Sequence, residues 1–204
     1  MAFDGVISGT GAVSQIGTGA TTLTGVNGYT GGTTISGGTF IGSARSFGTG
    51  AILNNAALVI DQPADATFAN AINGTGSFIK QGAGALNYTG TGNLSGPTTV
   101  AAGLLSVNGS LANSAVAVQS GATLGGDGTV GATTIQSSGT VAPGNSIGTL
   151  HVNGAYSQAA GSVYQVQVDP NSNASDLIDV SGQATLTSGA GLNVVKDGSG
   201  GYQV

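Results

Sequence analysis

One short motif carries the residue types of a nucleophilic catalyst. Residues 144–148 read GNSIG, which fits the G-x-S-x-G pattern of a nucleophile elbow, and His151 follows five residues after Ser146. In a serine hydrolase the histidine takes the proton of the attacking serine and a carboxylate orients the imidazole. The elbow requires a helix after its turn, whereas the following IGTLHVNG is typical of a strand. We therefore interpret the motif as an ordinary turn and predict no catalytic residue.

A second motif resembles a phosphate-binding loop. Residues 126–131 read GDGTVG and match G-x-G-x-x-G, but the following ATTIQSSG cannot supply the helix N-terminus that binds a pyrophosphate. The same GGDG could form a calcium-binding turn, yet such turns come from nonapeptides in tandem, and this one occurs once. We predict no cofactor-binding residue and no cofactor.

Three aspartates near the C-terminus form the densest group of carboxylates. Asp169, Asp176 and Asp179 are of the types that serve as an acid and base pair or as ligands of a hard cation. The segment DPNSNASD is also rich in turn formers, and so is DQPAD at residues 61–65. We interpret all these aspartates as turn and solubility residues and predict no metal ligand.

The composition points to strands. The 204 residues include 39 glycines and no cysteine, 39% are hydrophobic and only 5% are charged. Glycine and β-branched residues are poor helix formers, so a core must be made of strands, without disulfides. A net charge of -5 with three cations excludes nucleic acid as a partner. The chain shows neither an apolar stretch long enough for a membrane helix nor a signal peptide pattern.

A long internal repeat organises the first two thirds of the chain. Residues 3–38 align without gaps on residues 68–103, an offset of 65, and the matched positions include Phe3 with Phe68. If one coil of a solenoid takes about 20–25 residues, this offset equals about three coils. We therefore expect the second copy to lie on the same face of the solenoid as the first.

The last third departs from this repeat and resembles a known family. The stretches GGDGTVG, APGNSIGTLHVNG, YQVQVD and SDLIDVSG, in this order, are similar to the pertactin-like C-terminal passenger region of bacterial autotransporters. The earlier units resemble autotransporter-associated β-strand repeats. The resemblance implies an all-β fold, a right-handed parallel β-helix, with repetitive coils over 1–124 and a continuous C-terminal segment over 125–204 that seeds folding. It also implies display outside the outer membrane, with the protein's own translocator barrel as a partner.

These observations predict a structural protein rather than an enzyme. We expect a stalk or adhesin scaffold of a surface-displayed or secreted passenger, with a host surface or self-association as further contacts. Threonine pairs at 33–34, 98–99 and 133–134 are candidates for such contacts or, less regularly, for ice binding. A polysaccharide-acting β-helix enzyme is the alternative, although three cations and one histidine offer little for that chemistry.

Overall fold

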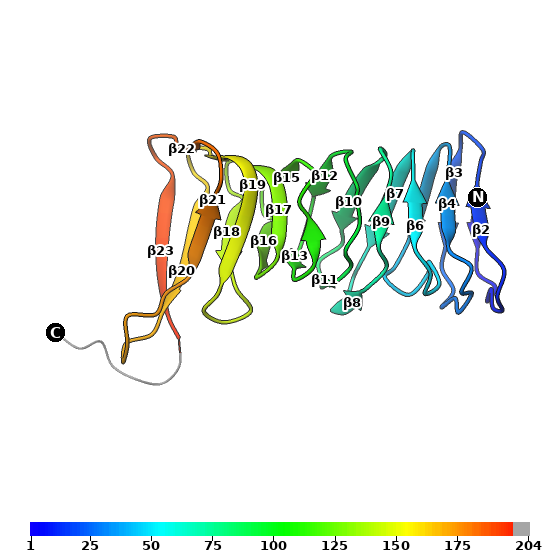
Figure 1. The fold of residues 1–204 in the computed structure, drawn as a ribbon, viewed down its shortest axis with the longest axis horizontal. Helices are drawn as coiled ribbons and strands as arrows, with labels where there is room; N and C mark the ends of the chain where they lie inside the picture. Colours follow the sequence, from blue (N-terminus) through cyan, green and yellow to red (C-terminus); the bar gives the residue numbers. More distant parts are fainter. Residues whose placement is uncertain (198–204) are drawn as a thin grey trace.

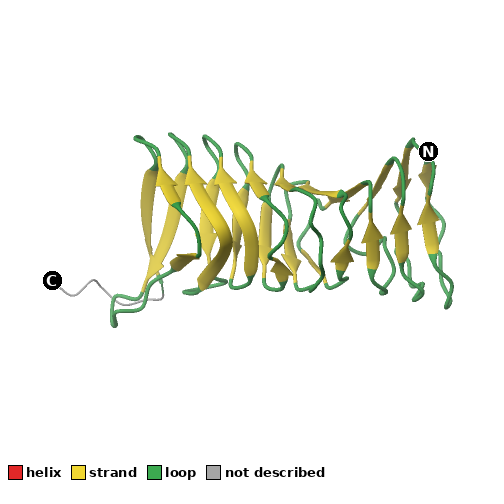
Figure 2. Ribbon diagram, turned by 45° about the horizontal axis from the view of Figure 1, so that its top comes forward, coloured by secondary structure: helices red, strands yellow, loops and turns green. Residues whose placement is uncertain are grey.

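The chain folds into a parallel β-helix, a solenoid whose long axis is horizontal in Figure 1. This is a computed structural model, and it describes residues 1–197. All regular structure in this range is strand, as Figure 2 shows by colour. Within residues 1–197 no helix is long and apolar enough to cross a membrane. The predicted all-β solenoid is therefore confirmed.

The strands form three parallel sheets along the axis. Sheet 1 has twelve strands. They are β1 (Ala2–Phe3), β3 (Ala20–Leu23), β5 (Thr39–Gly42), β7 (Ala57–Asp61), β10 (Ser77–Gln81), β12 (Thr98–Val100), β14 (Ser110–Leu111), β15 (Val116–Val118), β17 (Thr129–Ile135), β19 (Thr149–Gln158), β21 (Leu177–Val180) and β22 (Ala184–Leu186).

Sheet 2 has seven strands and sheet 3 has four. Sheet 2 consists of β8 (Ala66–Phe68), β11 (Ala85–Tyr88), β13 (Leu104–Val107), β16 (Thr123–Gly126), β18 (Thr140–Pro143), β20 (Val163–Val168) and β23 (Gly191–Lys196). Sheet 3 consists of β2 (Val13–Gln15), β4 (Thr33–Ile35), β6 (Ile52–Asn54) and β9 (Ile72–Asn73). One coil visits the three sheets in turn, as β7, β8, β9 and then β10 do. The boundary drawn between residues 124 and 125 falls inside β16.

One coil of the solenoid is too short for three coils to equal the 65-residue offset of the repeat. Leu23 pairs with Gly42 and Lys80 with Val100, so one coil takes about 20 residues in this part of the chain. Three such coils fall short of 65 residues, and the second copy begins further around the solenoid. Phe3 lies in β1 of sheet 1, whereas Phe68 lies in β8 of sheet 2. The expectation that both copies share a face is wrong.

Inward-pointing side chains stack into columns that run along the axis. In sheet 2 one column consists of Leu86, Leu105, Leu124 and Val141, each fully buried and paired with the next. Strand residues alternate between the interior and solvent, so each strand contributes one or two apolar side chains to the core, each in a different column. These columns of buried side chains end at the last coil, where Leu192 is 65% exposed. The hydrophobic core is therefore continuous across the 124/125 boundary but incomplete on its last coil.

Five aromatic rings form a ladder inside the first half of the solenoid. Phe40 packs on Phe47 and Phe47 on Phe68, edge to face, with ring centroids 5.4 and 6.4 Å apart. Tyr88 then lies 6.2 Å from both Phe68 and Phe78. Such pairs add stability beyond the area that they bury. Phe47, Phe68 and Tyr88 come from successive coils, so this part of the ladder ties neighbouring coils together.

Polar side chains inside the solenoid bind the carbonyl groups of its corners. Lys80 is fully buried in β10, and its Nζ donates to the carbonyl oxygens of Gly82 and Ala102, each at 2.8 Å. Burial lowers the pKa of Lys80, and the charge of Asp61 opposes this shift. The side-chain amide of Asn70 serves another corner in the same way, at Gly48 and Gly50. These contacts satisfy carbonyl groups that the sheet ladders leave free.

The threonine pairs do not form a surface row. In each pair the first threonine points inward and is buried: Thr33, Thr98 and Thr133. The hydroxyl of Thr98 lies 2.7 Å from that of Ser114, and Thr133 donates to the Gly131 carbonyl at 2.9 Å. Residues 33–34 also lie in sheet 3, whereas the other two pairs lie in sheet 1. The pairs therefore form no continuous threonine array, as their irregular spacing in the sequence already indicated.

Tyr88 should make the protein sensitive to alkali. Burial raises the pKa of Tyr88 to about 12, and its hydroxyl has no well-formed hydrogen bond within residues 1–197. The unfolded chain loses this proton near pH 10, before the folded chain does, so stability falls as pH rises from about 10 toward 12. We expect the fall in the free energy of unfolding over this pH range, measured with urea, to be about 2 kcal/mol smaller in Tyr88→Phe than in the parent chain.

Tyr156→Phe is the matched control for the hydroxyl itself. Tyr156 is also buried, but its hydroxyl donates to Oε1 of Gln158 at 3.2 Å. At neutral pH we expect Tyr156→Phe to cost about 1 kcal/mol and Tyr88→Phe to cost nothing. A larger cost at Tyr88 than at Tyr156 would show that the Tyr88 hydroxyl has a firm partner.

Candidate functional site

The serine and histidine of the elbow motif do not form a catalytic pair. Residues 144–148 join β18 directly to β19, so a strand follows the turn where the elbow needs a helix. The Ser146 hydroxyl donates to Oδ2 of Asp197 at 3.2 Å. The His151 Nδ1 lies 3.0 Å from Oδ2 of Asp179, and both side chains are about half exposed. His151 is therefore paired with Asp179 and does not serve Ser146 as a base.

The His151 and Asp179 contact follows from the coil geometry. The two residues are Cα partners on β19 and β21, neighbouring strands of sheet 1. Their separation of 28 residues reflects one long coil, which contains the loop 169–176. Sequence alone could have found this pair only if the length of that coil were known. As an exposed pair, it contributes little to stability.

The glycine-rich motif at 126–131 also leads into a strand. It spans the end of β16 and the start of β17, so the motif is followed by a strand and not by a helix whose N-terminus could bind a phosphate. Gly126 has a φ of 99°, which suits its place at a corner.

The three C-terminal aspartates lie in different environments. Asp169 accepts hydrogen bonds from the backbone of Asn171 and the hydroxyl of Ser172, which lower its pKa, and it sits in an exposed turn as predicted. Asp179 contacts His151. Asp176 is buried, and its two carboxylate oxygens accept the backbone N–H of Gly148 at 2.9 Å and of Gln167 at 2.7 Å. Within residues 1–197 no group of three or more His, Cys, Asp or Glu residues could hold a metal ion.

The interpretation of Asp176 as a solubility residue is therefore wrong. Asp176 is instead a buried bridge between the turn at 144–148 and strand β20. Burial is the main reason that the pKa of Asp176 is raised, and the charges of Asp127 and Asp197 add to the shift. The composition of DPNSNASD predicted the turn correctly, but it carried no signal that the last aspartate points inward.

Asp61 and Asp65 stand at a coil corner, as predicted. Asp61 ends β7 and accepts the side-chain amide of Gln81, while Asp65 precedes β8 and accepts the backbone N–H of Ala85. Each contact reaches the next coil, 20 residues on. Both aspartates stabilise the stacking of coils.

Asn145 was missed by the sequence analysis and joins three coils. Its Oδ1 accepts from the Ser106 hydroxyl at 2.9 Å, and its Nδ2 donates to Oδ1 of Asn108 at 2.8 Å and to Oδ2 of Asp127 at 2.9 Å. The partners lie as far as 39 residues back along the chain. The turn geometry is possible because Gly144 has a φ of 82°, which favours glycine. The GNSIG turn is therefore structural, and we call the hydrogen bonds that its Asn145 makes to the two preceding coils the Asn145 clamp.

We expect Asn145→Ala to lower the free energy of unfolding by about 2 kcal/mol, because it leaves partners on two neighbouring coils without their hydrogen bonds. Asn113→Ala is the matched control, since the exposed Asn113 makes no side-chain hydrogen bond within residues 1–197. Urea unfolding of both variants measures the difference. Equal stabilities would show that water replaces the clamp without cost.

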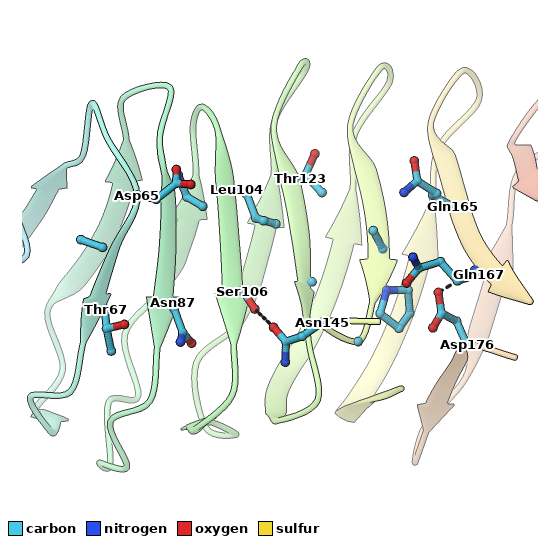
Figure 3. Close-up of a pocket in the computed structure, with 16 residues that line it drawn as sticks. Asp65, Thr67, Asn87, Leu104, Ser106, Thr123, Asn145, Gln165, Gln167 and Asp176 are labelled. Atoms are coloured by element: carbon cyan, nitrogen blue, oxygen red, sulfur yellow. Dashed lines mark hydrogen bonds between the residues drawn. The ribbon is translucent and has the colours of Figure 1, made fainter. Parts of the chain in front are cut away.

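A groove lies on the outer face of sheet 2. Its volume is about 590 Å³, and it crosses β8, β11, β13, β16, β18 and β20. Figure 3 shows its lining, with Asp65 at one end and Asp176 at the other. Asn145 forms part of the wall through its contact with Ser106. Lys80, His151 and Ser146 do not line this groove.

Comparison with known proteins now defines the class. Residues 13–41 and 78–107 match the family described as passenger-associated-transport-repeat. The two segments begin 65 residues apart, the same offset as in the internal repeat. The chain thus contains the repeats of an autotransporter passenger, folded as a β-solenoid.

Two curated relatives match about half of this chain, one named an extracellular protease and the other an autotransporter adhesin. An extracellular serine protease of Serratia marcescens is 44% identical over 105 residues, which make up 52% of this chain and 10% of that protein. The adhesin BmaC autotransporter of Brucella suis biovar 1 is 39% identical over 100 residues, 48% of this chain and 3% of that protein. The chain spans a tenth or less of the length of these relatives. The predicted resemblance to autotransporter passengers is confirmed.

Proposed function

We propose that this chain is a non-catalytic structural part of a surface-displayed or secreted autotransporter passenger, where it acts as a stalk and adhesin scaffold. One observation carries the proposal: a single core of inward columns runs through the coils, and the polar side chains that resembled active sites serve the stacking of those coils. A solenoid of this kind is an extended support whose coils depend mainly on their neighbours.

Export and partners belong to the same proposal. Passengers of this family are carried to the outside of the outer membrane, so the partners expected here are the protein's own translocator barrel, a host surface and other passenger copies. One relative is named an adhesin and the other a protease. The protease name does not favour catalysis by this chain, because Ser146 and His151 have separate partners.

Surface display can be tested directly. The full chain, with an N-terminal epitope tag, would be joined to an autotransporter barrel and expressed in a bacterium without adhesins of its own. We expect antibody to bind the tag on intact cells, and the cells to adhere to epithelial cells better than cells that carry the barrel alone. If the tag is accessible but adherence is unchanged, the chain is a stalk without adhesive function. If the tag is inaccessible, the display proposal fails.

The C-terminal segment is proposed to seed folding. It contains the longest strands of the described chain, with ten residues in β19, seven in β17 and six each in β20 and β23, against two to five in the strands that begin before residue 125. Long strands form more hydrogen bonds at once, so they repay more of the ordering entropy of the first coil. This supports nucleation at residues 125–204.

The seed proposal predicts unequal behaviour of two fragments. We expect residues 125–204 to fold alone, and residues 1–124 to remain disordered without them, as measured by circular dichroism and urea unfolding beside the full chain. If residues 1–124 fold equally well alone, those coils do not need the C-terminal segment as a template. That result would leave the scaffold function unchanged and remove the seed.

A further inference from the structure

The groove on sheet 2 owes its depth to one outward column of side chains. Register places Thr67 beside Asn87, Asn87 beside Ser106, Ser106 beside Gly125, and Gly125 beside Ala142. Side chains therefore shrink toward the middle of the groove. At Gly125 even a methyl group would come within 2.6 Å of the Ala142 carbonyl oxygen. The hollow is thus built into the backbone packing.

The groove presents hydrogen-bonding groups without positive charge. Among the lining residues that the structure describes there is no lysine, arginine, histidine or aromatic side chain. The polar lining consists of hydroxyl and amide groups with one carboxylate near each end: Thr67, Thr123, Ser106, Asn87, Asn145, Gln165, Gln167, Asp65 and Asp176.

Several of these groups are free to bind a ligand. The side chains of Thr67, Thr123, Gln165 and Gln167 make no hydrogen bond to other residues within 1–197, although all four line the groove. Both carboxylates instead accept backbone N–H groups, Asp65 from Ala85 and Asp176 from Gly148 and Gln167. An amide or hydroxyl both donates and accepts, which suits a ligand that carries many hydroxyl groups.

Charge and sheet geometry disfavour two other common ligands of such a surface, anionic polymers and extended peptides. An anionic polymer would meet two carboxylates and no cation in the groove, on a chain of net charge -5. A peptide would gain no backbone pairing, because the groove lies on the face of a sheet and not on its edge. A neutral, hydroxyl-rich chain has neither disadvantage.

We propose that this groove binds a neutral glycan that lies along the solenoid axis, across the strands of sheet 2. Six strands spaced about 4.8 Å apart give a track of roughly 24 Å, enough for several sugar units. Without aromatic rings the binding depends on hydrogen bonds, so single chains bind weakly and repeated display raises the avidity. This inference rests on the proposed surface location, and it makes the scaffold itself an adhesive surface.

The test compares the full chain with a variant in which a larger side chain fills the groove. Ala142→Met would place an uncharged bulky side chain on the floor of the groove, from an outward position of β18 that is half buried. Ala117→Met is the matched control, because Ala117 is also outward and half buried, on β15 of sheet 1. Circular dichroism and urea unfolding would verify that both variants fold as the parent chain does.

Binding would be measured on an array of neutral, sialylated and sulfated glycans, followed by calorimetry with the neutral polysaccharide that binds best and, separately, with poly-lysine. We expect neutral glycans to bind, Ala142→Met to weaken their binding about tenfold, and Ala117→Met to leave it unchanged. A double variant with Gln165→Ala and Gln167→Ala should also weaken it, without filling the groove.

Three results would overturn the inference. They are no binding of any neutral glycan, equal binding by Ala142→Met and the parent chain, and binding of poly-lysine or of charged glycans alone. These results concern binding by the purified chain, so they are separate from the display experiment. If the chain is displayed but binds no glycan, the scaffold function stands and the groove is not a site. If it binds glycans but is not displayed, the surface proposal fails.

Discussion

Replacing Phe68 with alanine should lower the free energy of unfolding by about 3–5 kcal/mol, the largest effect expected of any single truncation here. Phe68 is fully buried on β8, between Phe47 on one side and Tyr88 on the other. Its loss removes the central rung of the aromatic ladder. Since neighbouring coils provide the template for each other, the cavity weakens stacking in both directions along the axis.

The matched control for Phe68→Ala is Phe3→Ala. Both phenylalanines hold the same position in the two copies of the 65-residue repeat, but Phe3 is 41% exposed on β1. We expect Phe3→Ala to cost no more than about 1 kcal/mol in urea unfolding. Equal costs at the two positions would mean that the repeat places both copies in equivalent surroundings, contrary to the register of the sheets.

Replacing Asp176 with alanine should cost about 2–3 kcal/mol at neutral pH, the second largest effect. The substitution leaves the backbone N–H groups of Gly148 and Gln167 without their acceptor in a buried place. Asp179→Ala is the control, because Asp179 is exposed and its side chain pairs with the half-exposed His151 alone among residues 1–197. We expect that control to change stability by less than about 1 kcal/mol.

The effect of Asp176→Ala should also depend on pH. Burial raises the pKa of Asp176, so the folded chain takes up this proton at a higher pH than the unfolded chain does. The contribution of the carboxyl group to stability is therefore fully present below the ordinary pKa of aspartate, and part of it is lost as pH rises through the raised value. Urea unfolding should show a larger loss for Asp176→Ala at about pH 4 than at about pH 7. The opposite order would mean that hydrogen bonds to the carboxylate outweigh its burial.

The candidate sites show where a local pattern is sufficient and where it is not. The chain around Ser146 and the chain after Gly131 favour strands, which was enough to reject a nucleophile elbow and a phosphate loop. The turn at 61–65 was equally clear from its composition. Asn145 and Asp176 could not be placed in this way, because their partners lie on other coils, 39 and 28 residues away in the longest contacts.

By itself, the sequence determined the class of structure: strands without helices, a repeat with an offset of 65, and the resemblance to autotransporter passengers. These follow from residue types and their order, which act locally through backbone conformation and the alternation of side chains. Only the tertiary structure decided the length of the coil, and with it the face on which each residue lies. Coil length is the sum of several strands and turns, and a difference of a few residues per coil accumulates over three coils into a change of face. The inward position of Lys80, the clamp at Asn145 and the groove on sheet 2 all depend on that register.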